Sequence, residues 1–436
     1  MRVVNVGMLG LGTVGTGVAR LLVENSSIIE EKLGARLVLK RIAVRDTKKV
    51  RDIGDGGWEI TSDIDSILAD PGISIIVELI GGYSPAREYV LAAINNGKNV
   101  VTANKALLAF HGDEIYAAAE RAQVEVRYEA AVAGGIPVLS AIKGNMCANR
   151  FWTVLGILNG TCNYILTRMT REGADFAAAL KKAQELGYAE ADPPFDIEGI
   201  DTAHKLCLLV SLCFGTRIDF KEIHTEGISS VSSLDIDYAA RCGYRIKLLA
   251  IGKRSGDLVE ARVQPAMVPM DDPLAAIDGV YNAVRVTGDY AGTVMFSGRG
   301  AGMAPTASAV VGDLVAVARN ILTGRGRRIA PLGFLDGKIA TLPVKPVGDT
   351  ISKYYLRFSV ADRPGILARI AGALGSNQVS VRSAIQTSKR VGEAVPVVIV
   401  THEAMEKDVR KAIDMVESLG ITSQRVVMLR IEDDLA

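Results

Sequence analysis

Apolar residues in the first third of the chain fall into short runs, with stretches of helical spacing between them. Residues 3–9 and 73–80 are nearly continuous apolar runs, which is the pattern of strands covered on both faces. Strands that alternate with helices predict an α/β fold with a doubly wound parallel sheet. The predicted strands are 3–9, 37–44, 73–80, 98–102 and 124–132, and the predicted helices are 13–23, 85–96 and 112–123.

After the fifth predicted strand the pattern changes. Helical spacing covers residues 176–186 and 199–214. Two segments at 245–252 and 258–264, joined by a turn, predict an antiparallel hairpin. We therefore expect a second, mixed α+β domain over residues 135–302.

The last third contains a long helix, a linker and a small module. The helix consists of small apolar residues, and we expect residues 303–322 to pack on the first domain, 1–134. Residues 341–353 carry two prolines and a glycine, which is typical of a linker. Residues 354–433 predict a ferredoxin-like βαββαβ module. Its predicted strands are 354–360, 379–386, 394–401 and 425–432, and its helices are 365–376 and 405–419.

Composition and charge argue against several classes of protein. The 436 residues suggest about three domains. Lys and Arg number 50 and Asp and Glu 49, so the net charge of +1 gives no general attraction to nucleic acid or to an anionic membrane. The apolar runs are far shorter than the roughly 20 residues that span a bilayer, and the first residues lack the pattern of a secretory signal. Five scattered cysteines without a C-x-x-C pair predict a reduced, cytoplasmic setting.

A glycine-rich turn follows the first predicted strand. Residues 10–15 read Gly-Leu-Gly-Thr-Val-Gly and open a helix, which is the context of a dinucleotide-binding turn. Gly10 permits the tight turn, Gly12 lets the backbone approach a pyrophosphate, and Gly15 allows close packing of helix on strand. The N–H groups at the helix start, Thr13 and Val14, would face the phosphates. A glycine turn without a ligand is the alternative, and we favour binding.

The end of the second predicted strand bears on the choice of cofactor. An acidic residue there normally holds the ribose 2′-hydroxyl of NAD. In this chain the strand is followed by Arg45 and Asp46. An arginine suits a 2′-phosphate and favours NADP, whereas Asp46 could serve a ribose and Arg45 could be a solvated surface charge. NAD therefore stays open.

Two more segments lie after predicted strands. Lys105 follows the strand 98–102, at the edge where parallel strands form a ligand crevice. It could reach a phosphate or a substrate oxyanion, or be an ordinary surface lysine. The bend from Glu129 to Pro137 exposes carbonyls that could bind a hard cation together with a carboxylate. From the residues alone, a plain hinge between domains is the favoured interpretation of this bend.

Residues 187–205 form the most informative segment. A predicted helix ends at Gly187, an acidic loop with two prolines follows, and another helix begins. Asp201 and Lys205 are four residues apart and share one helix face. Apolar neighbours predict that this helix is buried, so a lysine within it needs a reason. The reason is either a structural ion pair or a pocket for a cationic substrate, and His204 is expected to pack rather than to react.

Taken together, these segments resemble the bacterial homoserine dehydrogenases that carry a C-terminal ACT domain. The resemblance covers essentially the whole chain, and residues 187–206 are its most specific part. Cys162 stands where this family more often has threonine. The motifs that carry the resemblance are GLGTVG (10–15), VTANK (101–105), YEAAVAGGIP (128–137), NGTCNYIL (159–166), GYAEADPPFDIEGIDTAHKL (187–206), GAGMAPTASAVVGD (300–313) and DRPGIL (362–367).

The resemblance implies an activity and a set of catalytic roles. The activity is the reversible NAD(P)-linked interconversion of L-aspartate 4-semialdehyde and L-homoserine, on the route to threonine, methionine and isoleucine. Lys205 would be the general acid and base, Asp201 would bind substrate and orient Lys205, and Glu190 would hold the substrate amino group. The residue chemistry agrees, because an aldehyde that accepts hydride leaves an alkoxide that needs a proton.

The same resemblance implies the remaining contacts. Lys105 would touch cofactor and substrate, and Gly187 and Gly302 would line the nicotinamide side. A structural monovalent cation, typically sodium, would be held by Glu129 and by the backbone of Val132, Gly134 and Ile136.

The resemblance also bears on regulation and partners. Threonine is the expected ligand of the last domain, at the turn 362–366, where N–H groups at a helix start can hold a carboxylate. A domain used only for subunit pairing is the alternative. We expect a homodimer or a higher homo-oligomer. Two other functions stay open at this point: a different Rossmann oxidoreductase acting on an amino-acid aldehyde or imine, and a sensor that binds cofactor or amino acid without turnover.

Overall fold

The structure is a computed structural model that describes residues 2–49, 53–54, 56–190, 192–324, 329–335, 338–386 and 394–433. The chain divides into two compact units. Unit 1 consists of Met1–Gly160, Thr202–Ile223 and Tyr281–Leu342, and unit 2 consists of Thr161–Asp201, His224–Val280 and Pro343–Ala436. No helix among the described residues is long and apolar enough to cross a membrane.

Unit 1 contains a parallel sheet with the strand order β3-β2-β1-β4-β5-β6. The order reverses between β1 and β4, and doubly wound sheets bind their ligands at such a switch point. This confirms the predicted fold class. The strands are β1 (Val3–Leu9), β2 (Arg36–Ala43), β3 (Glu59–Thr61), β4 (Ile75–Glu78), β5 (Asn99–Thr102) and β6 (Val126–Arg127), and the helices are α1 (Thr13–Glu24), α2 (Ser26–Leu33), α3 (Ile64–Ala69), α4 (Ala86–Asn95), α5 (Lys105–Ala122) and α6 (Val138–Lys143).

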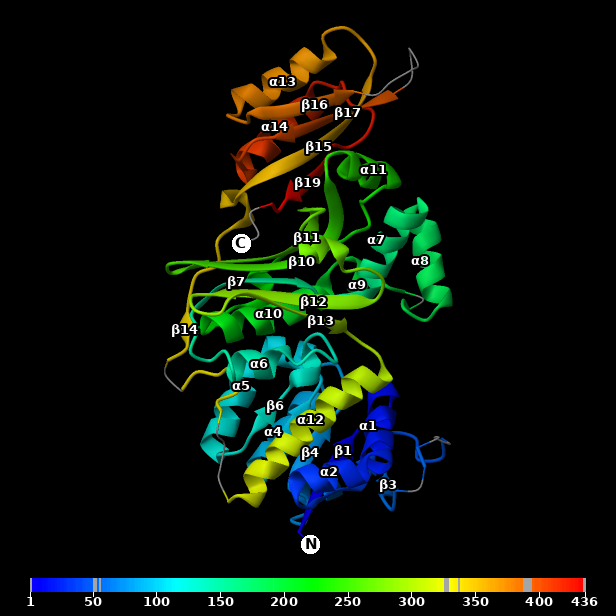
Figure 1. Ribbon diagram of the computed structural model, residues 1–436, viewed down its shortest axis with the longest axis vertical. Coiled ribbons are helices and arrows are strands. Elements are labelled where there is room, and N and C mark those ends of the chain that lie inside the picture. Colours follow the sequence, from blue (N-terminus) through cyan, green and yellow to red (C-terminus); the bar gives the residue numbers. More distant parts are fainter. Residues whose placement is uncertain are drawn as a thin grey trace. The chain divides into compact units, whose positions relative to one another are not determined.

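Helix α12 (Met303–Leu322) shares the apolar core of this sheet. Figure 1 shows it beside α1, and the two helices are in contact. Gly17 of α1 has no room for a side chain, because a Cβ there would lie 2.8 Å from Cγ of Met303. Val310 and Leu314 are fully buried in the same cluster as Val18.

Unit 1 also contains an antiparallel group of strands with the order β13-β12-β7. The sequence pattern did not single out these strands. The group consists of β7 (Phe151–Ile157), β12 (Tyr281–Gly288) and β13 (Gly292–Arg299), and the short strands β8 (Thr216–Arg217) and β14 (Ala340–Thr341) pair with each other elsewhere in the unit.

Unit 2 is built on the long antiparallel hairpin of β10 (Tyr244–Ser255) and β11 (Leu258–Pro269). This confirms the predicted hairpin, which is longer at its ends than the pattern indicated. The helices of this unit that precede its C-terminal part are α7 (Gly160–Glu172), α8 (Phe176–Glu185), α9 (Pro194–Ile197) and α11 (Ser233–Arg241). The short strand β9 (His224–Thr225) pairs with β11, and α10 (Ile200–Phe214) begins in this unit and continues into unit 1.

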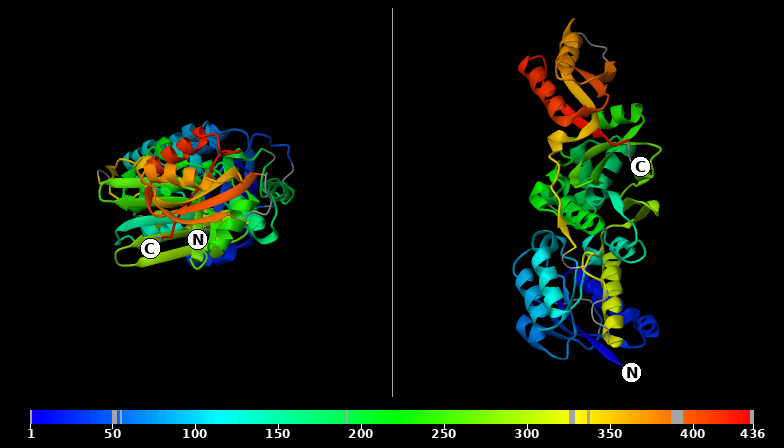
Figure 2. Two further views of the ribbon diagram at one scale, coloured as in Figure 1. Left: turned by 90° about the horizontal axis from the view of Figure 1, so that it is seen from above. Right: turned by 90° about the vertical axis from the view of Figure 1, so that its left-hand side faces the viewer.

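The C-terminal part of unit 2 has the predicted βαββαβ order. Its antiparallel strands follow the order β19-β15-β17-β16, and its two helices pack against each other and on the sheet (Figure 2). This confirms the ferredoxin-like module. β19 also pairs with β11, so the strands of the module continue the sheet of the hairpin. The elements are β15 (Ile351–Ala361), α13 (Ile366–Ser376), β16 (Val381–Gln386), β17 (Ala394–Thr401), β18 (Ala404–Met405), α14 (Glu406–Ser418) and β19 (Val427–Ile431).

Some predicted boundaries were wrong for physical reasons. The strand predicted at 124–132 ends at Arg127, because the amide of Glu129 turns away and donates to Oδ2 of Asp313 at 2.8 Å. A short 3-10 helix, Glu129–Ala131, follows. The strand predicted from 354 begins at Ile351, because its first residues pair with β18.

The helix predicted from 112 begins earlier, at Lys105. The side chain of Asn104 accepts a hydrogen bond from the amide of Leu107 at 3.1 Å and so caps the helix start. The sequence pattern also missed α2, β3 and α3, which are short and lie between longer elements.

Candidate active site

The glycine-rich turn joins β1 to α1 at the switch point of the parallel sheet. Gly10 has a φ of 100°, and a Cβ there would lie 2.7 Å from the carbonyl oxygen of Leu79. A Cβ at Gly15 would lie 2.5 Å from the carbonyl oxygen of Gly10. At Gly12, by contrast, no described atom lies within 4 Å of the Cβ position. Among the described residues no side chain caps α1, so the turn has the open backbone and the uncapped amides that a pyrophosphate needs.

A buried carboxylate lies beside this turn. Glu78 ends β4 and is fully buried. Its Oε2 accepts from Oγ1 of Thr102 at 2.6 Å, and its Oε1 accepts from the amides of Ile80 and Gly81 at 2.8 and 3.1 Å. Glu78 therefore holds the loop that approaches Gly10. Sequence reasoning missed it, although an acidic residue inside an apolar run was a usable signal.

Arg45 and Lys105 lie at the carboxyl ends of their strands, as predicted. Arg45 is exposed, and within the described part of the chain it forms no ion pair. The neighbouring Asp46 accepts from the amide of Lys48 at 2.9 Å. Lys105 is half-buried and is the first residue of α5. A cation is unfavourable at a helix N-terminus, so helix stability does not explain this lysine.

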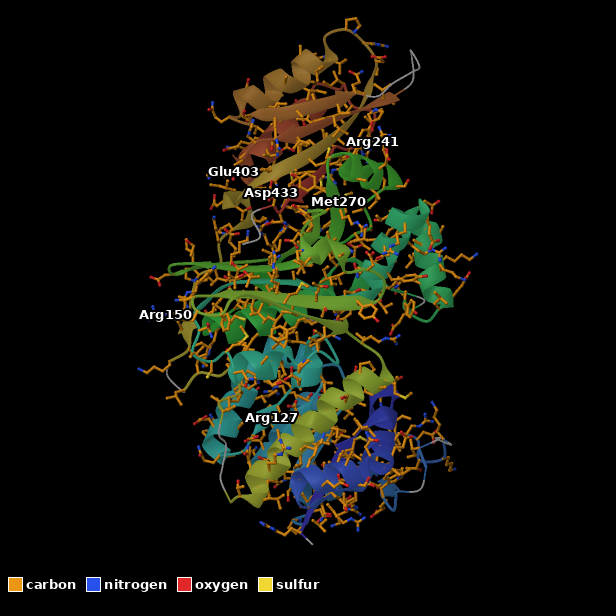
Figure 3. All side chains as sticks on the ribbon, in the orientation of Figure 1. Arg127, Arg150, Arg241, Met270, Glu403 and Asp433 are labelled. Atoms are coloured by element: carbon orange, nitrogen blue, oxygen red, sulfur yellow. The ribbon has the colours of Figure 1, made fainter. Side chains whose placement is uncertain are left out.

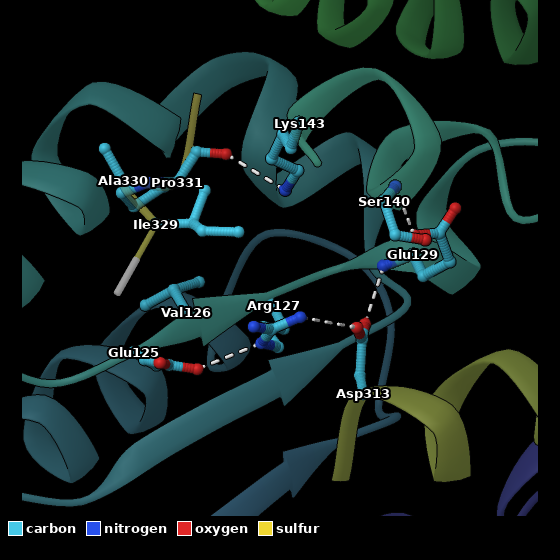
Figure 4. Close-up of a pocket in the computed structure, with 10 residues that line it drawn as sticks. All are labelled: Glu125, Val126, Arg127, Glu129, Ser140, Lys143, Asp313, Ile329, Ala330 and Pro331. Atoms are coloured by element: carbon cyan, nitrogen blue, oxygen red, sulfur yellow. Dashed lines mark hydrogen bonds and ion pairs between the residues drawn. The ribbon is translucent and has the colours of Figure 1, made fainter. Parts of the chain in front are cut away.

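The bend after β6 is built around the buried carboxylate of Glu129 (Figure 4). Its two oxygens accept from the amides of Leu139 and Ser140 at 2.8 and 2.7 Å. Ala133 and Gly134 follow with positive φ angles of 54° and 52°. Carboxylate oxygens have further lone pairs, so these bonds leave acceptors for a hard cation. Among the described residues no group of His, Cys, Asp and Glu side chains forms a metal cluster, and a cation here would depend on backbone oxygens.

A cavity of about 50 Å³ lies next to this bend and is lined by charged side chains. Burial raises the pKa of Asp313 to about 6 and lowers the pKa of Lys143 to about 8. Arg127 is labelled in Figure 3, and Figure 4 shows its side chain facing Asp313. Nη1 of Arg127 lies 3.8 Å from Oδ1 of Asp313. Sequence reasoning missed this cluster because its members come from separate segments. The charged residues that line it are Glu125, Arg127, Glu129, Lys143 and Asp313.

Lys205 is buried on α10, with 8% of its surface exposed, and its Nζ donates to the carbonyl oxygen of Leu158 at 2.6 Å. Asp201, one helical turn earlier, is 4% exposed. A solvated ion pair on the surface is therefore not the reason for this lysine. His204 stacks on Phe220 with ring centroids 4.4 Å apart, as expected of a packing residue.

The acidic loop, residues 187–199, is described in the structure at 187–190 and 192–199. These residues are held in unit 2 by the start of α7. Oγ1 of Thr161 donates to the carbonyl oxygen of Tyr188 at 2.6 Å, and Sγ of Cys162 to that of Asp196 at 3.2 Å. The unusual Cys162 thus anchors the loop. The carboxylate of Glu190 is exposed, and within the described residues it forms no ion pair.

The remaining predicted glycines lie at helix ends. Gly187 follows α8 with a φ of 73°, and Gly302 precedes α12 with a φ of 121°. Residues that carry a side chain rarely adopt either backbone conformation. Each glycine therefore lets its chain turn sharply, and backbone is presented there without a side chain.

Family models match three consecutive parts of the chain. Residues 10–129 match the homoserine dehydrogenase NAD-binding domain, residues 137–315 match homoserine dehydrogenase, and residues 354–417 match the ACT domain. These matches agree with the parallel sheet, the segment that contains Lys205, and the βαββαβ module.

Individual relatives match over nearly the full length. A homoserine dehydrogenase of Pseudomonas aeruginosa is 45% identical over 433 residues, which cover 99% of both chains. The crystal structure of a homoserine dehydrogenase from Thiobacillus denitrificans has a TM-score of 0.94 and 44% identity, with 99% of both chains covered. A hyperthermophilic archaeal homoserine dehydrogenase in complex with NADPH has a TM-score of 0.63 and 26% identity over 75% of this chain and 100% of that one. The chain belongs to the homoserine dehydrogenase family and combines an NAD(P)-binding domain with a C-terminal ACT domain.

Proposed function

We propose that this homoserine dehydrogenase interconverts L-aspartate 4-semialdehyde and L-homoserine with Lys205 as its proton donor and acceptor. The observation that carries the proposal is a buried lysine, 8% exposed, which follows a loop rich in carboxylates. The full-length relatives share the dehydrogenase name. They support neither an enzyme for a different aldehyde or imine nor a sensor without turnover.

The proton chemistry follows from the position of Lys205. When bound, the reduced cofactor supplies a hydride to the aldehyde carbon. The aldehyde oxygen then gains negative charge, and Lys205 donates a proton to it. The carbonyl of Leu158 accepts one of the three ammonium N–H groups and holds Nζ in place. In the reverse direction the neutral amine takes the hydroxyl proton, and Asp201 on the same helix face orients the lysine and binds substrate.

The acidic loop supplies the contact for the substrate ammonium. Glu190 is exposed on this loop, so its carboxylate is available to a cationic amino group. Such a contact is equally strong in ground state and transition state, and Glu190→Gln should therefore raise KM for homoserine and leave kcat close to wild type. Asp201→Asn should lower kcat instead, because it removes the charge that orients Lys205.

The cofactor contacts rest on unit 1. Gly10, Gly12 and Gly15, with the amides of Thr13 and Val14, would bind the pyrophosphate. Arg45, exposed after β2, would bind a 2′-phosphate and make NADP preferred over NAD, and the archaeal relative in complex with NADPH supports this preference. Lys105 would contact cofactor and substrate. The proposed nicotinamide contacts are Gly187 and Gly302.

We also propose a structural cation, sodium, in the bend after β6. Its ligands would be Glu129 and the backbone oxygens of Val132, Gly134 and Ile136. The positive φ angles at 133 and 134 and the buried carboxylate support this site. Replacing sodium chloride by choline chloride at equal ionic strength should lower the melting temperature. Identical melting curves would contradict the site.

For the ACT domain we propose regulation by threonine at the turn 362–366. Gly365 caps α13 with a φ of 86°, and no described atom lies within 4 Å of its Cβ position, so a carboxylate has room to approach. Inhibition of the intact enzyme by threonine, lost in Gly365→Val, is the expected result. A chain truncated at Lys353 is a poor control for threonine inhibition. The truncation removes not only the ACT domain but also Arg430, which donates a hydrogen bond to Glu226 outside that domain.

The assembly and the domain division are proposals too. β13 lies at the end of its sheet and is largely exposed, and an unpaired strand edge can pair with a second copy. We expect a homodimer or higher homo-oligomer in a reduced, cytoplasmic setting, testable by light scattering. The proposed domains are 1–134 with 303–322, 135–302, and 354–433 after a linker at 341–353, of which residues 351–353 already belong to β15.

The test of the whole proposal is an absorbance assay with L-homoserine and NADP⁺. The wild type should form NADPH, and Lys205→Ala should be strongly impaired. Lys221→Ala replaces an exposed lysine and should behave like wild type. No NADPH formation by the folded wild-type enzyme would overturn the proposed substrate.

A further inference from the structure

In unit 2, residues 224–228 pack against the acidic loop. The amide of Ile228 donates to the carbonyl oxygen of Ile197 at 2.8 Å. A Cβ at Gly227 would lie 2.4 Å from that same oxygen, so the two segments meet without spare room. The amide of Glu226 in turn donates to the carbonyl oxygen of Val263 on β11 at 2.7 Å. Residues 224–228 therefore connect the acidic loop to the central hairpin.

The side chain of Glu226 extends from this segment into an ion cluster that is centred on a buried arginine, Arg430. Nη1 and Nη2 of Arg430 donate to its two carboxylate oxygens at 2.7 and 2.9 Å. Arg430 is fully buried on β19, and its guanidinium also donates to Glu406 at 2.7 Å. Arg410 on α14 adds a bond to Glu226 at 3.2 Å.

This cluster keeps Glu226 charged. Burial alone would raise the pKa of Glu226, but hydrogen bonds from His224 and Arg430 outweigh burial and hold that pKa below its usual range. Arg430 and Glu406 belong to the ACT module, whereas Glu226 belongs to the segment against the acidic loop. A buried arginine between two carboxylates is costly to disrupt, because the partner left behind has no solvent to compensate it.

We propose that Glu226 is a positioning residue for substrate binding, through which the ACT domain holds the acidic loop in place. The ACT side of the cluster fixes Glu226, Glu226 fixes residues 227 and 228, and these fix the backbone of Ile197. The chain then reaches Asp201 through Gly199, which has a φ of 83°. A Cβ added at Gly199 would lie only 3.0 Å from Cγ1 of Val263, so the backbone passes close to the hairpin here. The inference rests on the proposed function only for the identity of the substrate.

Glu260 provides a matched control. It lies on β11, and its carboxylate pairs with Lys345 at 3.1 Å and with Arg262 at 3.4 Å. Its side chain is 20% exposed, against 32% for Glu226. Both glutamates tie the hairpin region to the C-terminal part of the chain. Among the described residues, neither ion pair of Glu260 involves a side chain of residues 226–228 or of the acidic loop. A general loss of charge or stability would therefore affect both variants alike.

The test compares Glu226→Gln with Glu260→Gln in the full-length enzyme. We expect Glu226→Gln to raise KM for homoserine about 3- to 10-fold, with kcat and KM for NADP⁺ within about 2-fold of wild type, as loss of substrate positioning predicts. Glu260→Gln should keep all three constants within about 2-fold. Equal kinetics for the two variants would overturn the proposal, and so would an equal rise in the KM of both substrates.

Two further measurements keep the result decisive. Gly227→Ala leaves every charge intact and displaces the backbone of Ile197, so it should raise KM for homoserine in the same way, even if Glu226→Gln fails to fold.

Limited proteolysis tests the position of the acidic loop without any substrate. Cleavage within residues 187–199 should be faster in Glu226→Gln than in Glu260→Gln, and equal rates would contradict the proposal. A wild type without homoserine activity would overturn the proposed function alone, because the proteolysis comparison still tests Glu226.

Discussion

The glycine turn of unit 1 and the acidic loop of unit 2 are held in place in opposite ways. In the turn, Gly15 approaches the carbonyl of Gly10, and Gly10 approaches Leu79 at the end of the adjacent strand. These are contacts between backbone atoms. The acidic loop is held by a hydroxyl, a thiol and a backbone amide that come from α7 and from residues 224–228.

This difference predicts how each region responds to substitution. Apart from Glu78, which holds the loop that Gly10 contacts, the turn depends on its own glycines, and substitution of more distant side chains should affect it little. A loop held by side chains from other segments depends on residues that never touch substrate. Regulation by a remote domain is therefore easier to build on the acidic loop than on the cofactor turn.

The largest expected effect is that of Lys205→Ala. General acid catalysis is typically worth about 10²- to 10⁴-fold, so kcat should fall by that factor. Cofactor affinity, measured by fluorescence titration with NADPH, should hardly change, because the glycine turn is built from its own backbone. A variant with near-normal turnover would move the proton donor elsewhere, with Lys105 as the first candidate.

The next effect concerns the cofactor side. Arg45→Ala should weaken NADP⁺ binding about 10- to 100-fold, since a charge-assisted hydrogen bond contributes about 1.5–3 kcal/mol. Use of NAD⁺ should stay nearly the same. Lys48→Ala, which removes a neighbouring exposed cation, is the control in KM measurements with both cofactors. Equal losses for the two cofactors would show that Arg45 does not recognise the 2′-phosphate.

A smaller effect tests the anchoring of the acidic loop. Thr161→Val removes the 2.6 Å bond to Tyr188, and the loss of about 1 kcal/mol should raise KM for homoserine about 5-fold. Thr170→Val removes a similar hydroxyl bond on the same helix, to Leu166 at 2.7 Å, and should leave KM unchanged. Matching KM values for the two variants would mean that the loop does not depend on its anchors.

The smallest effect concerns the charged cavity beside the Glu129 bend. Asp313 has a pKa raised to about 6, so its stabilising contribution is present below the unfolded-state pKa of about 4 and is lost as pH rises through 6. Between pH 5 and 7 the wild type should lose about 1 kcal/mol from this group. Asp313→Asn cannot ionise and should lack that loss in urea unfolding. Lys143 has a pKa lowered to about 8, so it changes its charge above the pH range of this experiment.

The sequence by itself determined those features whose cause lies within a few residues. Apolar runs and helical spacing specify the parallel sheet and the βαββαβ module, the glycines at 10, 12 and 15 specify the turn, and a four-residue spacing places Asp201 and Lys205 on one helix face. Each depends on backbone geometry and side-chain period, which act locally.

Only the tertiary structure decided which distant side chains meet. The strand predicted to reach Val132 stops at Arg127 because Asp313, far along the chain, accepts the amide of Glu129. Glu226 meets Arg430 because β19 pairs with β11 in a register that places Arg430 beside Ala266. A buried charge needs its partner at hydrogen-bond distance, and sequence spacing carries no information about a partner that strand pairing brings from two hundred residues away.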